Sequence, residues 1–391
     1  MITTSALQIS RIFLILTFIP IGYHAQENKK IVKSNTENVK IIEDKIIITD
    51  WTLNPAIKND IYITGKVNDN KNIKVVTDID SLEVNLKPNQ TYDFVILKNG
   101  KDSCFTSFQT PEVANFSRLK PQQKEKIKFE LTEFNNIKLK SLLNKKDSVN
   151  LNFDSGAVDF YLTKTAIQKY LNPNNLPLTM NDISNNTIKI GNNEWVNQQI
   201  YPIEITSQGT EGMFGWNIFD GKIVEINYDD EVITIHSKLP KISKAYEKFK
   251  IEYMKEHFRI ELEFEINAKR YKSNFLFDTG FQKAALMDYD LLTKNLINTS
   301  ELKILKSSTL LNSQKKEIKL NTINVEKIIF GKYILNNIPT ELNNYNKPAL
   351  YETHFLGSDI IKRFNVILDF QNNFVFLKPN KHFNDVYFDK K

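Results

Sequence analysis

The chain has 391 residues, of which 41% are hydrophobic and 25% are charged, a balance typical of a folded protein with room for two or three domains. The net charge is +6, and the basic residues are spread along the chain without interleaved aromatic side chains, so no nucleic acid partner is expected. A single cysteine, Cys104, excludes an intramolecular disulfide and a thiolate zinc cluster. The histidines are scattered without ligand spacing, so no metal or other cofactor is expected.

The N-terminal residues have the pattern of an export signal. Arg11 precedes an apolar run over residues 12–23, which is shorter than the ~20 residues that a membrane-spanning helix needs. Small Ala25 and a polar stretch follow, so the pattern predicts a cleaved signal peptide over residues 1–25 and no stable membrane insertion after cleavage. An uncleaved anchor is the alternative, because Tyr23 stands where a small residue is preferred. Export without disulfides favours a protein that is periplasmic or secreted in a bacterium.

Residues 26–112 have the pattern of a small antiparallel β domain. Short β-branched and aromatic runs are separated by turns rich in Asn, Asp, Lys and Gly. We see no polar constellation in this segment that could do chemistry, and we interpret it as a structural or docking module. Cys104 lies in an alternating run and is expected to be a buried small hydrophobe.

From about residue 120 the sequence repeats itself. Residues 214–219, 224–228 and 232–235 match residues 356–361, 366–370 and 374–377. A constant offset of 357 − 215 = 142 aligns all of these positions. Each copy predicts a short helical turn followed by a two-stranded hairpin. We therefore expect two equivalent lobes, over residues 113–240 and 241–391.

Each copy also contains an apolar strand that ends in an acid, a small hydroxyl residue and a glycine. The two triplets are Asp154-Ser155-Gly156 and Asp278-Thr279-Gly280. One such triplet is expected by chance in roughly 0.1–0.2 of chains of this length, so two at equivalent places of a repeat are a strong signal. If the lobes bring the two acids within about 3 Å, the carboxyls share one proton. The ionised acid can then activate water while the protonated acid donates to a peptide carbonyl oxygen.

These loops, together with the later apolar-apolar-Gly elements, resemble the retropepsin-like and pepsin-like aspartic peptidases, in particular the exported bilobal bacterial type. The likeness covers about residues 120–380 and implies a mainly β fold, a bilobal double β-barrel behind an N-terminal β domain. It implies that Asp154 and Asp278 are the catalytic pair. The residues implied to support the active-site loops are Ser155, Gly156, Thr279, Gly280, Gly215 and Gly357. The implied partner is a peptide or protein substrate, and one chain with both lobes is expected to act as a monomer.

The chain departs from the family pattern in two places. The spacing from the acid to a shared apolar-Gly element is 191 − 154 = 37 residues in the first lobe and 331 − 278 = 53 in the second, which indicates a missing or shortened hairpin in the first lobe. The family's substrate-covering flap is such a hairpin, so we expect the flap to come from the second lobe alone. Its candidate residues are Asn312, Ser313, Gln314 and Lys315. Phe281, where a small residue is more usual, is expected to narrow or reshape the site.

Three functions fit this pattern. We expect an aspartic endopeptidase, a hydrolase whose pH optimum lies nearer neutrality than that of stomach-type relatives, because Ala157 and Phe281 stand where those relatives place a hydroxyl donor. The alternatives are a non-catalytic peptide-binding or scaffold protein with a peptidase-like fold, and a structural role in which both aspartates cap turns. The pair of acids argues against both alternatives, because two facing carboxylates destabilise a fold that does not use them.

Overall fold

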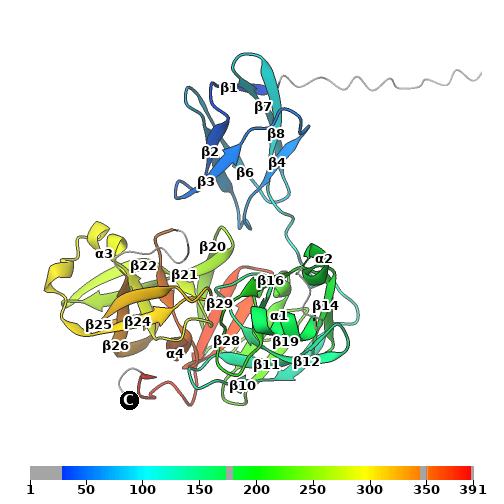
Figure 1. The fold of residues 1–391 in the computed structure, drawn as a ribbon. Helices are drawn as coiled ribbons and strands as arrows, with labels where there is room; N and C mark the ends of the chain where they lie inside the picture. Colours follow the sequence, from blue (N-terminus) through cyan, green and yellow to red (C-terminus); the bar gives the residue numbers. More distant parts are fainter. Residues whose placement is uncertain (1–28, 173–178, 344–348, 350, 389–391) are drawn as a thin grey trace, which may run out of the picture.

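The structure is a computed structural model that describes residues 29–172, 179–343, 349 and 351–388. The expected signal peptide, residues 1–25, lies outside the described residues. Strands hold 52% of the described residues and helices 8%, so the fold is mainly β, as predicted. Two four-stranded sheets form the N-terminal part, and two larger sheets form the rest (Figure 1). No helix in the described ranges is long and apolar enough to cross a membrane.

The N-terminal sheets have the strand orders β1-β7-β8-β4 and β3-β2-β5-β6. Their strands are β1 (Lys30–Ser34), β2 (Asn38–Glu43), β3 (Ile47–Thr52), β4 (Asp60–Ile63), β5 (Lys71–Val76), β6 (Ser81–Leu86), β7 (Thr91–Lys98) and β8 (Asp102–Gln109). Buried side chains from both sheets, such as Ile41, Ile73 and Phe94, form one apolar core. Cys104 is buried in this core, as expected.

The prediction of a purely antiparallel arrangement for this segment is wrong. Strand β1 runs parallel to β7, and β4 runs parallel to β8. The chain crosses between the two sheets after β1 and again between β3 and β4, so both strands lie beside partners that are distant in sequence. Crossover connections can join parallel strands, whereas the short turns seen in the sequence can join only antiparallel ones.

The first repeat unit, residues 124–236, supplies a sheet of order β15-β14-β11-β12-β17-β13-β16. Its elements are β9 (Lys124–Lys128), β10 (Glu130–Leu131), β11 (Ile137–Leu143), β12 (Asp147–Phe153), β13 (Phe160–Thr163), α1 (Lys164–Tyr170), α2 (Met180–Ile183), β14 (Asn186–Ile190), β15 (Asn193–Gln198), β16 (Ile200–Ile203), β17 (Gly212–Phe214), η1 (Trp216–Phe219), β18 (Ile223–Asn227) and β19 (Val232–His236). In this unit β12 runs parallel to β17, which pairs antiparallel with β13.

The second repeat unit, residues 247–379, has the same plan. Its elements are β20 (Glu247–Met254), β21 (His257–Ile266), β22 (Lys269–Phe277), β23 (Ala285–Asp288), α3 (Tyr289–Lys294), η2 (Thr299–Glu301), β24 (Ile304–Leu311), β25 (Glu317–Phe330), β26 (Tyr333–Asn343), β27 (His354–Leu356), α4 (Ser358–Ile361), β28 (Phe364–Asp369) and β29 (Phe374–Pro379). Here β22 runs parallel to β27, which pairs antiparallel with β23. The three-strand arrangement that precedes each hairpin is therefore duplicated.

The two units join through an antiparallel pair of equivalent strands, β18 and β28. Val224 pairs with Leu368, and Ile226 pairs with Val366. The offset of 142 makes residue 224 equivalent to 366 and residue 226 equivalent to 368. Exchanging the two units therefore turns one of these pairs into the other, and the equivalent residues Glu225 and Ile367 pair at the centre. This register places a pseudo-two-fold axis between the units. Strands β19, β9, β29 and β20 extend the shared sheet on either side.

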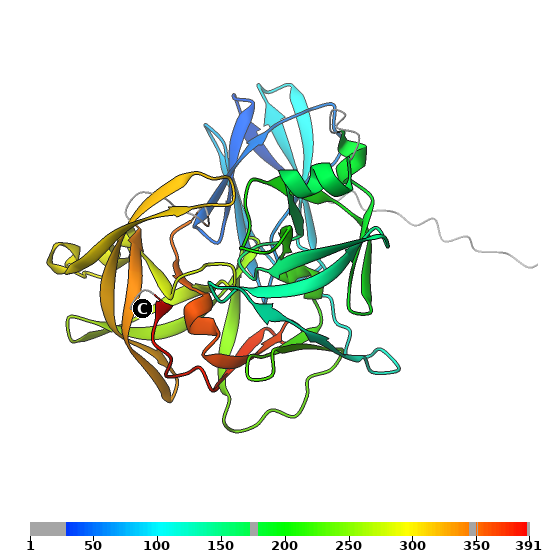
Figure 2. The ribbon, with the colours of Figure 1, turned by 60° about the horizontal axis from the view of Figure 1, so that its bottom comes forward.

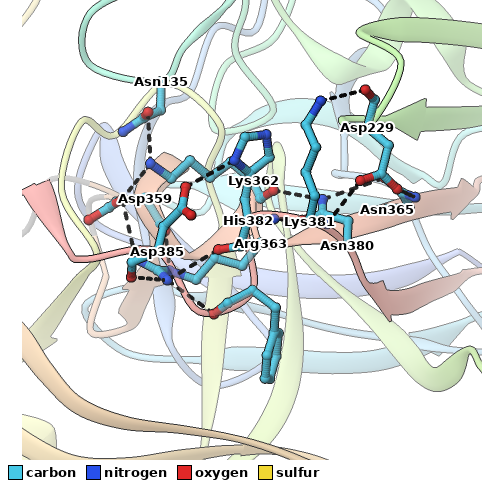
Figure 3. A network of polar contacts seen from close by, with 11 residues as sticks. Asn135, Asp229, Asp359, Lys362, Arg363, Asn365, Asn380, Lys381, His382 and Asp385 are labelled. Carbon is cyan, nitrogen blue, oxygen red and sulfur yellow. Dashed lines mark hydrogen bonds and ion pairs between the residues drawn. The ribbon is translucent and has the colours of Figure 1, made fainter.

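A buried ionic cluster near the C-terminus braces both units (Figure 3). The Arg363 guanidinium stacks on Tyr387 and donates hydrogen bonds from Nη1 to three backbone carbonyls, those of residues 382, 383 and 385. Asp359 forms ion pairs with Lys362 at 3.0 Å and with Arg363 at 3.7 Å. Lys362 Nζ also donates to Asn135 Oδ1 of the first unit at 2.9 Å. The cluster therefore ties the C-terminal segment and the second unit to the first.

Candidate functional site

The two acid loops meet at the pseudo-two-fold axis. Asp154 directly follows β12, and Asp278 directly follows β22. The backbone N–H of each aspartate donates to the carbonyl of the neighbouring parallel strand, at 3.0 Å to Phe214 in the first unit and 3.0 Å to Leu356 in the second. Each loop is thus fixed at the end of a central strand by the same bond, and the duplicated strand plan places the two carboxyl groups face to face.

Two hydroxyl residues link the loops by reciprocal hydrogen bonds. Ser155 Oγ donates to the carbonyl of Phe277 at 2.7 Å and accepts from the N–H of Thr279 at 3.0 Å. Thr279 Oγ1 donates to the carbonyl of Phe153 at 2.7 Å and accepts from the N–H of Ser155 at 2.9 Å. Both hydroxyls are buried, so their donor and acceptor capacity has to be met within the protein. This network fixes the relative position of the two loops.

The loop glycines leave the room that the carboxyl groups fill. A Cβ on Gly156 would lie 2.5 Å from Cγ of Asp278, and a Cβ on Gly280 would lie 2.1 Å from Oδ2 of Asp154. Each carboxyl group lies directly against the glycine of the opposite loop, so a side chain at either glycine would displace a carboxyl group. The glycine in each triplet is therefore required by the close approach of the acid from the opposite loop.

The carboxyl groups share a hydrogen bond and are only partly exposed to solvent. Burial raises the pKa of Asp154 and raises the pKa of Asp278 well above its usual range, and the charge of Asp154 raises the latter further. Backbone N–H groups oppose these shifts: Gly156 donates to Asp154 at 2.9 Å, and Gly280 and Phe281 each donate to Asp278 at 2.9 Å. Two carboxyls that share a hydrogen bond cannot both ionise cheaply, so one proton stays on the pair at pH values where an ordinary aspartate is already ionised.

The later glycines lie against the loop segments of their own units. A Cβ on Gly215 would lie 2.2 Å from Cα of Val158, and one on Gly357 would lie 2.0 Å from the carbonyl oxygen of Lys283. The next residue in each unit donates its backbone N–H to the acid loop, from Trp216 to Ala157 at 3.2 Å and from Ser358 to Phe281 at 2.8 Å. These elements therefore support the two loops from behind.

Asn136 and His257 also contact the loops, and sequence analysis assigned no role to either. Asn136 Nδ2 donates to the carbonyls of Thr279 and Gly280 at 2.8 and 3.1 Å, across the boundary between the units. Conversely, the imidazole of His257 in the second unit interacts with the backbone of Gly156 in the first unit. Burial lowers the pKa of His257 to about 4. Asn136 directly precedes β11 and His257 is the first residue of the equivalent strand β21, but their offset of 257 − 136 = 121 differs from the 124 that separates the acids. A search at a fixed offset misses them.

The flap candidates form the tip of the β24–β25 hairpin, which extends from the second unit toward the first (Figure 2). Asn312 Oδ1 accepts from the backbone N–H groups of Gln314 at 3.0 Å and Lys316 at 2.9 Å, so the turn is well ordered. The carbonyl of Ser313 accepts from the N–H groups of Glu204 and Ile205 in the first unit, at 2.9 and 3.2 Å. In the first unit, the segment between α1 and β14 is described only in part and contains helix α2.

A separate apolar cluster connects the second acid loop with this hairpin. Phe281 of the loop packs on Phe355 of β27, with ring centroids 6.0 Å apart. Leu310 and Ile318, which face each other across the hairpin, pack in the same cluster, and so does Leu286 of β23. We refer to these five residues as the lobe-two pocket. Phe281 thus packs in an apolar cluster three residues after Asp278, and whether it narrows or reshapes the site stays a prediction.

Comparison with models of known protein families and with curated proteins finds no match to this chain. In the ranges that the structure covers, no group of three or more His, Cys, Asp or Glu side chains could hold a metal ion. The chemistry of the site has to be argued from its geometry.

Proposed function

We propose that this chain is an aspartic endopeptidase of the retropepsin-like or pepsin-like type, with Asp154 and Asp278 as its catalytic pair. The observation that carries the proposal is the pair itself: two partly buried, hydrogen-bonded carboxyls on equivalent loops, with the loops tied by the reciprocal bonds of Ser155 and Thr279. Holding two acids together in this way lowers the stability of the fold, and such arrangements are common where the shared proton serves a reaction. The double β-barrel arrangement of the family is part of the same proposal, and so is action as an exported monomer.

In the proposed reaction, a water molecule lies between the two carboxyl groups. The ionised carboxyl takes a proton from this water as the water oxygen bonds to the peptide carbonyl carbon, and the protonated carboxyl donates its proton to the carbonyl oxygen. The resulting diol collapses when the first carboxyl passes its proton to the amide nitrogen, the second takes a proton from a diol hydroxyl, and the C–N bond breaks. The pair then holds one proton again and is ready for another cycle.

The supporting groups act through position. The N–H donors of Gly156, Gly280 and Phe281 orient the carboxyl groups in a fixed direction before substrate binds. The β24–β25 hairpin would cover a peptide that lies across the acids, excluding bulk water and holding the scissile bond near the attacking oxygen. The lobe-two pocket would receive an apolar side chain of that peptide.

The test is hydrolysis of denatured casein by the purified chain, with and without pepstatin, from pH 3 to 8. We expect peptide release that pepstatin blocks and that Asp154→Asn abolishes. The second candidate function, peptide binding without cleavage, is favoured by the lobe-two pocket, which could hold a peptide side chain whether or not cleavage follows. Binding of casein peptides with no hydrolysis at any pH would support this second function and contradict the first.

A further inference from the structure

The turn between β2 and β3 in the N-terminal sheets reaches the lobe-two pocket. Ile47, at the start of β3, is only 3% exposed, and it packs in the same apolar cluster as the five pocket residues rather than in the core of its own sheets. Its strand neighbour Ile48 is 60% exposed. The aliphatic side chain of Ile47 is thus buried in a cluster whose other members belong to the second repeat unit.

The position of the pocket shows what Ile47 obstructs. Leu276, another member of the cluster, stands two residues before Asp278, and Phe281 stands three residues after it. On the opposite side, Leu310 and Ile318 belong to the hairpin that would cover a substrate. A peptide held between the acids and this hairpin would place a side chain against this cluster, where Ile47 is packed.

The turn is held in shape before it meets the pocket. Asp44 and Lys45 both have positive φ angles, and the N–H of Ile46 donates to the carbonyl of Glu43 at 3.0 Å, which closes a tight turn. Lys71 Nζ lies 2.6 Å from Asp44 Oδ2 and fixes the turn to β5. Because the turn is ordered by contacts within its own sheets, it presents Ile47 with little further loss of conformational entropy.

A second contact fixes the N-terminal sheets beside the two repeat units. Lys66 is buried among Trp216, Tyr253 and Phe370 and forms an ion pair with Asp220. A polar cavity of about 410 Å³ lies between this contact and the β2–β3 turn, lined by side chains that include Asp44, Asn68 and Glu252. The apolar contact at Ile47 is therefore small and separated by a polar gap from the Lys66 anchor, so the turn can leave the pocket without unfolding of either part.

We infer that the β2–β3 turn is a built-in competitor for the substrate cleft, with Ile47 filling the subsite that receives an aliphatic substrate side chain. The inference rests on the proposed function for its effect on catalysis, and on packing alone for its effect on binding. Burial of one isoleucine side chain corresponds to roughly a 10- to 100-fold preference for the bound state. The turn should therefore weaken substrate binding without abolishing it, and a larger peptide with further contacts should displace it.

The test compares Ile47→Asp and Ile47→Ala with the parent chain and with Ile48→Asp as the matched control. One readout is kcat/KM for a peptide with leucine or isoleucine on both sides of the scissile bond. The other is the dissociation constant of the same peptide, measured by fluorescence anisotropy in the Asp154→Asn background, where cleavage does not interfere. We expect Ile47→Asp to improve both quantities by about 10-fold or more, Ile47→Ala to improve them several-fold, and Ile48→Asp to match the parent.

The two readouts separate the inference from the proposed function. Unchanged or weaker peptide binding in both Ile47 variants overturns the inference, even if every variant hydrolyses the peptide. Tighter binding without hydrolysis in any variant supports the inference and contradicts the proposed function. Ile47→Ala keeps the comparison valid if Ile47→Asp does not fold, which thermal unfolding of each variant will show.

Discussion

Asp154 and Asp278 should destabilise the fold at the pH values at which the proposed reaction takes place. Their raised pKa values mean that the native state holds a proton at pH values where the unfolded chain has already lost it. Stability therefore falls as pH rises through the native pKa, and the full contribution of these groups is present only below about pH 4, the ordinary aspartate value.

We expect Asp278→Asn to abolish hydrolysis and to raise the free energy of unfolding at pH 7. The amide keeps the shape of the carboxyl but removes an acid from a two-acid reaction, and it also removes the repulsion within the pair. The gain should be about 1.4 kcal/mol for each unit of pKa shift that is relieved, and it should vanish below about pH 4. Urea unfolding at pH 3 and 7 measures this, with exposed Asp102→Asn as the control. Substantial turnover, or a gain that is the same at both pH values, would contradict the shared-proton assignment.

The side chains beside the two acids should also affect the pH optimum of the proposed hydrolysis. Ala157 and Phe281 offer no side-chain donor to the carboxyl groups, and burial raises both pKa values, so the bell-shaped profile of kcat/KM should lie at higher pH than a pair of ordinary carboxyls would give. Ala157→Ser adds a hydroxyl beside the acids and stabilises the ionised form of the pair. It should therefore shift the acidic limb of the kcat/KM profile to lower pH. An unmoved limb, or a parent enzyme with its optimum below about pH 4, would show that side-chain donors do not set the profile.

Among the elements, the β24–β25 hairpin is the one whose removal should affect turnover most. The carbonyl of Ser313 already accepts two hydrogen bonds from the first unit, so the hairpin lies across the space between the units. Replacing residues 313–316 with two glycines should lower kcat/KM by at least 100-fold while the melting temperature changes little, because the tip is at the surface. The matched replacement of residues 184–185 in the first unit should have a much smaller effect. If both replacements lowered kcat/KM equally, the prediction that the substrate-covering hairpin comes from the second unit alone would be wrong.

Local patterns predicted the repeated elements because each depends on neighbouring residues. The helical turns η1 and α4 and the hairpins β18–β19 and β28–β29 follow from alternation and turn residues within about twenty positions. The pairing of β1 with β7 does not follow from such local patterns, because it depends on which of the two sheets the chain enters after each strand. Asn136 was missed for a similar reason: it contacts a loop 143 residues away through a single amide group, and isolated asparagines carry no pattern.

At the scale of the whole molecule, the relative position of the two acids depends on how firmly the repeat units are joined. The β18–β28 pairing makes one connection, and the cluster around Arg363, which directly precedes β28, makes another through Lys362 and Asn135 (Figure 3). The guanidinium is buried and meets several carbonyl oxygens in a fixed geometry, which an ammonium group cannot reproduce.

We therefore expect Arg363→Leu to lower the free energy of unfolding by about 3 kcal/mol or more, because it leaves buried carbonyls without donors and removes one partner of Asp359. Arg363→Lys should recover only part of this loss. Exposed Lys381, which donates to the carbonyl of Asp229 at 2.6 Å, is the matched control, and Lys381→Leu should cost less than about 1 kcal/mol because its partner stays hydrated. Chemical denaturation of the three variants measures these differences. A loss for Arg363→Leu no larger than that for Lys381→Leu would mean that the C-terminal segment does not hold the units together, and that the β18–β28 pairing alone fixes the distance between the acids.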